Sequence, residues 1–184
     1  MINRKVKILL IGSNIWYFGE GMFGPLLAVF AQRIGGNILD ITWAWAIYLI
    51  ISGTFVMIIG KIADQYSREK IMMAGYILNA LFTFSYLLVK NPMQLFIVQA
   101  GLGLASALAI PTWSALYDIN YTKKENKSYV WGLASGQAQI VTGLAVIIGG
   151  IISSKFSFSA LFLAMGTIQI IAVILQAQIL RNKN

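Results

Sequence analysis

The chain of 184 residues contains no cysteine, no histidine and only three prolines. Without cysteine or histidine it cannot build disulfides, thiolate or imidazole metal sites, Ser-His-Asp triads or Cys-His dyads. Acidic residues are also few, six against fourteen Lys and Arg, and charged residues of both signs make up 11% of the chain. These absences exclude most common enzyme sites, and we expect neither an enzyme nor a bound metal or other cofactor.

Apolar residues make up 58% of the chain and its mean hydropathy is +0.75, outside the usual range of soluble domains. Six long apolar stretches are each long enough, as helices, to cross a hydrocarbon core of ~30 Å. They are apolar on all sides, which argues against barrel strands. We therefore expect an all-α membrane protein with one domain over residues 1–184 and six transmembrane helices. Their approximate spans are 8–31, 41–60, 71–89, 95–117, 129–152 and 158–180.

Basic residues are unevenly divided between the two sides that these spans define. The side that holds both termini collects eleven of the fourteen, and by the positive-inside rule it is cytoplasmic. We expect a multi-pass protein of the cell (plasma or inner) membrane, and the net charge of +8 then reflects topology rather than a nucleic-acid-binding surface. The outer side has Arg33, Lys90 and Lys155. The inner side has Arg4, Lys5, Lys7, Lys61, Arg68, Lys70, Lys123, Lys124, Lys127, Arg181 and Lys183.

The loop between the second and third spans reads GKIADQYSREK, residues 60–70. It resembles the G-x-L-A-D-R-x-G-R-[RK]-[RK] signature of the major facilitator superfamily of secondary transporters. The resemblance implies that Gly60, Asp64 and Arg68 belong to a cytoplasmic gate, and Asp118 could be the acid that pairs with Arg68. The alternative is a solvated turn whose surface charges contribute ~0–1 kcal/mol. Ile62, Ala63 and Lys70 also fit the signature, whereas Gln65, Ser67 and Glu69 depart from it.

The resemblance runs from the first span to the sixth, but it corresponds to only one of the superfamily's two six-helix halves. It implies a half built from two inverted three-helix repeats. Two interpretations stay open. The chain is a fragment that lacks its second six-helix half, or it is complete and a second copy supplies the other half of a parallel homodimer.

Small residues recur at four-residue spacing in the fourth span. Gly101, Ala105 and Ala109 share one face and allow a neighbouring helix to approach closely, and Pro111 can bend this helix. The segment KNPMQ, residues 90–94, reads as a turn before the span.

Glu20 stands at the middle of the first span. A charged group at the bilayer midplane costs ~2.5–3.5 kcal/mol on insertion scales, so we expect the carboxyl group to face water, find a partner or take up a proton. We identify Glu20 as the candidate proton or cation coupling site. The alternative is a protonated side chain that holds two helices together. Gly19, Gly21 and Pro25 around it predict a helix that bends near its centre and lets a neighbour approach.

Other polar side chains inside the spans are candidates for lining a cavity, with hydrogen bonds between helices as the alternative. These are Tyr17, Asn79, Gln99 and Gln137. The face of the first span that carries Glu20 would form one side of a pathway, because successive residues turn by about 100° in a helix. That face contains Ser13, Trp16, Tyr17, Gly24 and Leu27.

Together these features predict a secondary active transporter, or the N-terminal half of one. It would move a small solute across the cytoplasmic membrane by alternating access, with proton coupling at Glu20. The expected partners are the lipid bilayer, a small-molecule solute, protons, and a second half or second copy. Two alternatives remain: a non-transporting membrane scaffold or assembly subunit, and an inactive truncated fragment.

Overall fold

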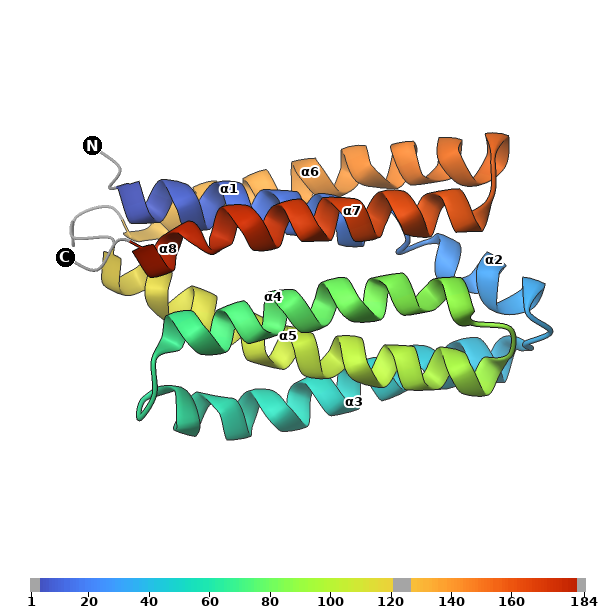
Figure 1. Ribbon diagram of the computed structural model, residues 1–184, viewed down its shortest axis with the longest axis horizontal. Helices are drawn as coiled ribbons and strands as arrows, with labels where there is room; N and C mark the ends of the chain where they lie inside the picture. Colours follow the sequence, from blue (N-terminus) through green and yellow to red (C-terminus); the bar gives the residue numbers. More distant parts are fainter. Residues whose placement is uncertain (1–3, 121–126, 182–184) are drawn as a thin grey trace.

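The computed structural model describes residues 4–120 and 127–181, and every regular element in these ranges is a helix (Figure 1). The expected basic residues Lys123, Lys124 and Lys183 lie outside the described residues. In chain order the helices are α1 (Arg4–Gly21), α2 (Leu26–Arg33), α3 (Ile38–Ala63), α4 (Arg68–Ser85), the 3-10 helix η1 (Tyr86–Leu88), α5 (Pro92–Asn120), α6 (Lys127–Lys155), α7 (Phe158–Gln176) and α8 (Gln178–Arg181).

Five stretches of helix are long and apolar enough to cross a membrane: α3, α4 with η1, α5, α6, and α7 with α8. The first expected span, 8–31, is instead divided into α1 of 18 residues and α2 of eight. Neither piece qualifies alone, because α2 is short and α1 carries three basic residues near its start. The expected bend near the centre of this span is therefore a complete break.

The helix of the fourth span begins earlier than its sequence predicts. Pro92 is the first residue of α5, within the segment expected to be a turn. Proline fits the first helical position because that position needs no N–H donor. Asn91 in front of it accepts the backbone N–H of Gln94 at 3.0 Å and so caps the helix. The helix then continues through Pro111.

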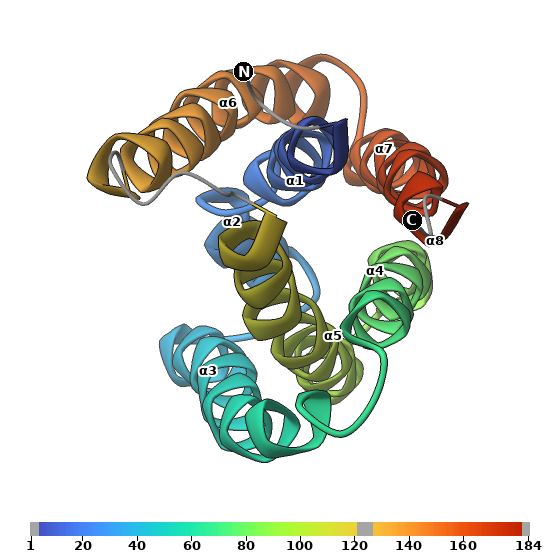
Figure 2. The same ribbon diagram turned by 90° about the vertical axis from the view of Figure 1, so that its left-hand side faces the viewer.

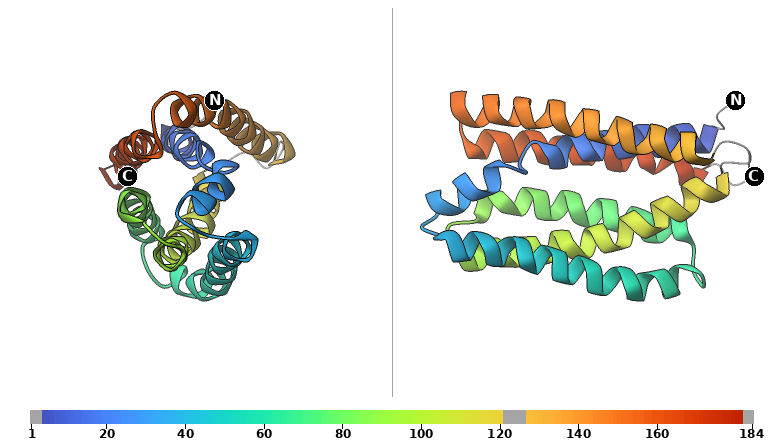
Figure 3. Two further views of the ribbon diagram at one scale, coloured as in Figure 1. Left: turned by 90° about the vertical axis from the view of Figure 1, so that its right-hand side faces the viewer. Right: turned by 180° about the vertical axis from the view of Figure 1, so that it is seen from behind.

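Seen along the bundle, the helices form an open arc in the order α6, α1, α7, α4, α5, α3 (Figure 2). Figure 3 shows the same arc from the opposite end. Neighbours in the arc are also the pairs that pack most extensively. The helices α3 and α6 stand at its two ends and pack mainly against α5 and α1 respectively. Only 11% of the most apolar stretch of each is buried, so both present open faces.

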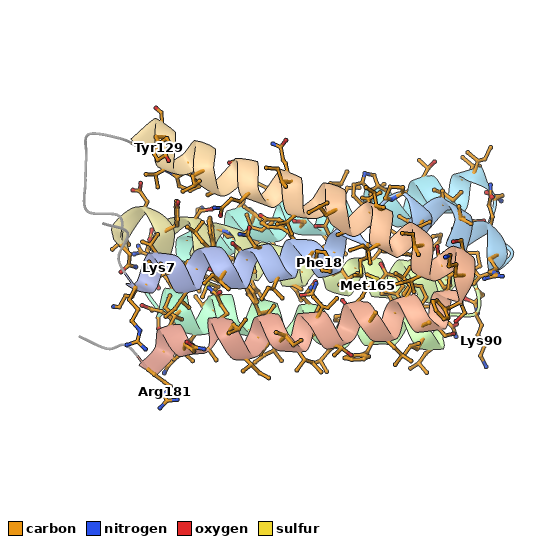
Figure 4. The ribbon with its side chains drawn as sticks, turned by 90° about the horizontal axis from the view of Figure 1, so that it is seen from above. Lys7, Phe18, Lys90, Tyr129, Met165 and Arg181 are labelled. Carbon is orange, nitrogen blue, oxygen red and sulfur yellow. The ribbon has the colours of Figure 1, made fainter. Side chains whose placement is uncertain are left out.

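Buried apolar side chains form two clusters. The first surrounds α2 and contains packed rings, with Phe23 4.8 Å from Tyr86 and 5.2 Å from Phe162 between ring centroids. The second contains Trp16 and Tyr76, whose rings meet edge to face at 4.3 Å. We call them the outer cluster and the inner cluster. The inner cluster lies toward the end of the bundle that carries Lys7 and Arg181, and Lys90 marks the opposite end (Figure 4).

The small residues of the fourth span do allow close helix packing. A Cβ atom at Gly75 of α4 would lie 2.7 Å from the backbone nitrogen of Ala109 and 2.8 Å from the carbonyl oxygen of Ala105. Gly101 likewise lies against the ring of Phe82. The predicted face of α5 is confirmed as the surface on which α4 packs.

We expect Gly75→Ala to destabilise the bundle by about 1–3 kcal/mol, because the added methyl group forces the backbones of α4 and α5 apart. The control is Gly53→Ala in α3, where a Cβ atom meets nothing within 4 Å. The control should be neutral or stabilising, since alanine favours helix. Thermal unfolding of both variants in detergent micelles checks the difference, and equal melting temperatures would contradict the close contact.

Candidate functional site

Polar side chains interrupt the core at one depth. Each of α1, α4, α5 and α7 contributes to the inner cluster at one end and to the outer cluster at the other. On α4, α5 and α7 one polar side chain stands between the two sets: Asn79, Ser106 and Gln169. Glu20, in the last turn of α1, lies beside Asn79. Tyr48 of α3 joins them by donating its hydroxyl hydrogen to Ser106 Oγ, with 3.2 Å between the oxygens. We call these five residues the polar layer.

The polar layer lies near mid-depth of the bundle. Phe18, two residues before Glu20, lies near the middle of its length, between the ends marked by Lys7 and Lys90 (Figure 4). The outer and inner clusters therefore place apolar packing on both sides of Glu20 along the bundle axis.

Glu20 occupies the last turn of α1 and is half-buried. Its carboxyl group interacts with the side-chain amide of Asn79 and the indole of Trp16. Asn79 is 2% exposed, and its Nδ2 completes no well-formed hydrogen bond with a described residue. An incompletely paired amide donor is costly in a membrane interior. Asn79 is therefore placed to donate to Glu20 after a small movement of either side chain.

The hydroxyl groups of three tyrosines lie within electrostatic range of Glu20. They belong to Tyr17 of α1, Tyr48 of α3 and Tyr86 of η1. Of these three, Tyr48 donates its hydroxyl hydrogen to Ser106.

The end of α1 beside Glu20 is shaped by glycine and proline. Pro25 has no backbone N–H and so cannot donate to the carbonyl four residues earlier; here, unlike at Pro111, the helix is interrupted. A turn replaces the ladder, in which the N–H of Phe23 donates to the carbonyl of Glu20 at 3.3 Å. Gly149 of α6 lies directly against the carbonyl of Met22, where any side chain would collide. Irregular backbone at membrane depth is tolerated where protein covers it, and α6 supplies part of that cover.

Three neighbouring helices hold α1 in place with side-chain hydrogen bonds, one each from α5, α7 and α6. The bonds run from Trp113 Nε1 to the Leu9 carbonyl (3.1 Å), from Gln169 Nε2 to the Trp16 carbonyl (3.2 Å), and from Asn14 Nδ2 to Gln137 Oε1 (3.2 Å). Gly12 and Gly19 make room for the side chains of Gln176 and Gln169. These bonds join α1 to three helices, and the one at the Trp16 carbonyl lies one turn before Glu20.

A pocket of about 120 Å³ opens between α1, α4, α5 and α6, next to Trp16 and Tyr17. Five aromatic side chains line it: Trp16, Tyr17, Tyr76, Trp113 and Trp131. Ser13, Ser114 and Ser135 also line it. We call this the aromatic pocket.

The predicted face of the first span is only partly correct. Ser13, Trp16 and Tyr17 do line one pocket. Gly24 and Leu27 do not share it, because the helix ends at Gly21 and Leu27 packs into the outer cluster. The periodicity argument fails beyond the break, since it assumes an uninterrupted helix.

The four candidate lining residues do not meet in a single cavity. Tyr17 lines the aromatic pocket. Gln137 is half-buried and bonded to Asn14, so it connects two helices. Asn79 belongs to the polar layer beside Glu20. Gln99 is 3% exposed within α5 and does not line the aromatic pocket.

The predicted gate loop joins α3 to α4. Gly60 is exposed in α3, Asp64 follows the end of that helix, and Arg68 begins α4. The Arg68 guanidinium donates to Asp64 Oδ1 at 2.7 Å, with exposed side-chain fractions of 31% and 72%. Asp118 is exposed in the last turn of α5, and its pairing with Arg68 stays a prediction. A surface crevice of about 330 Å³ contains Asp64 and Arg68.

Several contact residues escaped prediction from the sequence. Gln169 and Tyr76 were not singled out, although each had a usable signal. Gln169 and Gln176 are seven residues apart, matching Gly12 and Gly19 on α1, and Tyr76 precedes Asn79 by one helical turn. The described residues contain no group of three or more acidic side chains that could hold a metal ion.

The sequence pattern of the Major Facilitator Superfamily matches residues 9–182 of the chain. Among curated relatives, a protein named Multidrug resistance protein MdtG from Escherichia fergusonii is 23% identical over 98% of this chain and 45% of its own length. Proteins of the same name from Enterobacter lignolyticus and Klebsiella pneumoniae are each 24% identical over 87% of this chain, and over 39% and 40% of their own lengths. The chain thus spans less than half the length of these relatives.

We expect Gln169→Met to destabilise the bundle by about 1 kcal/mol, the usual size of a hydrogen bond between membrane helices. Methionine keeps the length of the side chain but removes the donor to the Trp16 carbonyl. Gln139→Met is the matched control, because Gln139 is exposed on α6. Thermal unfolding in detergent compares the melting temperatures of the two variants. An unchanged melting temperature for Gln169→Met would show that the bond to the Trp16 carbonyl does not stabilise the bundle.

Proposed function

Because the chain belongs to the major facilitator superfamily of multi-pass membrane transporters, we propose that it forms one half of a secondary active transporter. In this proposal it moves a small solute across the cytoplasmic membrane by alternating access, and Glu20 is the proton-coupling carboxyl group. Membership of a transporter family also means that the chain is not an enzyme.

The placement of Glu20 is the observation that carries the proposal. An ionisable group at membrane depth is costly and marks an ion or substrate pathway by default. Glu20 is half-buried at the break in α1, next to Asn79 and Trp16, and hydrogen bonds from three helices hold its helix in place. A carboxyl group held this way can release and regain a proton as its surroundings change between two conformations.

The packing of the helices supports a half-transporter with six crossings, in which α1 and α2 together cross once. The helices can be matched in two sets of three: α1–α2 corresponds to α5, α3 to α6 and α4 to α7. Under this correspondence each major helix–helix contact has an equivalent. The α3–α5 contact maps onto α6–α1, α4–α5 maps onto α7–α1, and α4–α7 maps onto itself. This is the pattern expected of two inverted three-helix repeats. The repeats differ at their prolines, since α5 continues through Pro111 and the first crossing breaks at Pro25.

The open faces of α3 and α6 are the proposed contact with the missing wall of the transport pathway. Glycines on these faces have no neighbour within 4 Å of an added Cβ atom, so another helix could approach them closely. They are Gly53, Gly60, Gly132, Gly136, Gly143 and Gly150. We propose that a second six-helix half occupies this side, with a second copy of the chain as the alternative.

The end of the bundle that carries Lys7 and Arg181 is the proposed cytoplasmic end (Figure 4). The Asp64–Arg68 pair lies in the loop at this same end in the proposed topology, and we propose that it belongs to the gate. The relatives are named multidrug resistance proteins. We therefore propose that the solutes are drug-like organic molecules.

We expect Glu20→Gln to abolish proton-driven solute movement, because glutamine keeps the hydrogen-bonding groups but cannot exchange a proton. The probe is doxorubicin, a fluorescent organic amine, in everted membrane vesicles with an imposed pH gradient. The variant's flux should fall to the level seen without a gradient. Asp40→Asn is the matched control, since Asp40 lies in the first turn of α3 and caps it through an oxygen that asparagine retains.

Two outcomes would count against this assignment. Gradient-dependent flux that survives in Glu20→Gln would remove the coupling role from Glu20. Vesicles that contain the unaltered chain, with its second half co-expressed, and that move no doxorubicin would favour the scaffold alternative.

For the gate, we expect Arg68→Gln to reduce doxorubicin flux severalfold while changing stability by less than about 1 kcal/mol, because exposed ion pairs contribute little to folding. Lys61→Gln, in the last turn of α3, is the control for loss of one positive charge at this end. Flux and thermal unfolding are measured on the same preparations. Equal flux in the two variants would identify the loop as an ordinary solvated turn.

A further inference from the structure

A cleft of about 540 Å³ opens at the end of the bundle opposite the one that carries Lys7 and Arg181, where α2 lies and α6 is joined to α7 (Figure 1). We call it the outer cleft. Its walls come from α2, the last turn of α6 and the first residue of α7. In the proposed topology this end lies at the outer surface of the membrane. The volume is in the range of small-molecule binding sites.

The wall formed by α2 changes from apolar to basic along its length. Leu26, Val29 and Arg33 line the cleft at three- and four-residue spacing, so they share one face of the helix. Leu26 begins α2 beside the break in the first crossing, and Arg33 ends it toward the outer surface. Val29 between them is 52% exposed. The wall thus has the polarity of a phospholipid, apolar toward the membrane interior and charged at the surface.

Arg33 is the charged residue of the cleft lining, and Phe158 holds it in place. The guanidinium carbon Cζ lies 5.4 Å from the centroid of the Phe158 ring. Arg33 forms no ion pair with a described carboxylate. Asp40, the nearest acid along the chain, accepts the backbone N–H of Asn37 at 2.8 Å instead. A guanidinium over a ring keeps N–H groups at its edge, where they can donate to a phosphate.

The wall formed by α6 is polar but uncharged. Ser153 and Ser154 donate their hydroxyl hydrogens to the carbonyls of Gly150 and Ile151, each at 3.1 Å. Their oxygens keep lone pairs that can accept, so they suit a ligand with hydroxyl donors. None of the lining residues is an acid that would receive an ammonium group. The lining therefore favours a glycerol head group over ethanolamine or choline.

We propose that the outer cleft binds an anionic phospholipid of the phosphatidylglycerol class. Its phosphate accepts charge-assisted hydrogen bonds from Arg33, its glycerol hydroxyls donate to Ser153 and Ser154, and its acyl chain lies along Leu26 and Val29. This inference goes beyond the proposed transport function. It requires only that this end of the bundle lies at the membrane surface, where lipid phosphates are found.

Native mass spectrometry of the chain released from nonionic detergent micelles counts the lipids that it retains. The micelles contain phosphatidylglycerol or phosphatidylcholine with the same acyl chains, or glycerol 3-phosphate as a head group without chains. We expect phosphatidylglycerol to be retained about fivefold more than phosphatidylcholine, the effect of one basic residue at a lipid surface. Glycerol 3-phosphate should not be retained at the same concentration, because it lacks the apolar contacts.

Substitutions of Arg33 test the phosphate contact. Arg33→Gln should lower the retained phosphatidylglycerol about tenfold, the effect of losing hydrogen bonds to a charged group. Arg33→Lys should recover part of the loss, because lysine keeps the charge but not the planar fork. Lys90→Gln is the matched control, since Lys90 is an exposed base at the same end of the bundle and does not line the cleft. Lipids held at the opposite end form a background common to all variants.

A further variant tests the cleft while it leaves the charge of Arg33 in place. Val29→Trp should fill the cleft and lower the retained phosphatidylglycerol as far as Arg33→Gln does. Val29 is exposed, so the larger side chain does not enter the core. Melting temperatures in lipid-free detergent verify that every variant is folded.

Equal retention of phosphatidylglycerol by Arg33→Gln and Lys90→Gln would overturn the proposal, as would full retention by Val29→Trp or equal retention of the two lipids. Retention of glycerol 3-phosphate equal to that of the lipid would identify a site for soluble phosphates and reject the lipid. These outcomes are separate from the test of coupling. The cleft can fail to hold lipid while Glu20→Gln still abolishes flux, and it can hold lipid while flux does not depend on Glu20.

Discussion

The need to satisfy backbone hydrogen bonds away from water governs this structure, and it acts most strongly where α1 ends. Pro25 removes a donor at mid-depth and frees carbonyl groups that lipid cannot satisfy. A local turn replaces the ladder there, and Gly149 of α6 lies against the Met22 carbonyl. Nearer the start of α1, side-chain hydrogen bonds join this helix to α5, α6 and α7.

That constraint also explains how the core is divided. Rings and aliphatic side chains pack in two clusters, and the polar layer lies between them at the depth of the break. Polar groups gather there because each one gives another a partner: Tyr48 donates to Ser106, and Asn79 lies beside Glu20. The tightly packed helices α4, α5 and α7 form the support, whereas α3 and α6 remain largely uncovered.

Much of this arrangement could be anticipated from the sequence. The glycines and proline around Glu20 predicted a bend, where the structure has a full break. The small residues of α5 predicted close packing, and the spacing of Ser13, Trp16 and Tyr17 predicted one shared face. Periodicity failed at Gly24 and Leu27, because a helical face cannot be extended across a break. The start of α5 at Pro92 was also missed, since proline is equally at home in a turn and in a first helical position.

By itself, the sequence determined that the helices lie in lipid, because apolar runs of membrane length require helices there. It also determined the depth of Glu20, which falls at the middle of the first run. Only the tertiary structure decided what surrounds that carboxyl group. Asn79, Tyr48 and Gln169 lie on three other helices, and the sequence offered only faint signals of their meeting in one layer. The physical reason is that helical periodicity specifies which side chains share a face, whereas the choice of facing helix depends on packing among residues far apart in the chain.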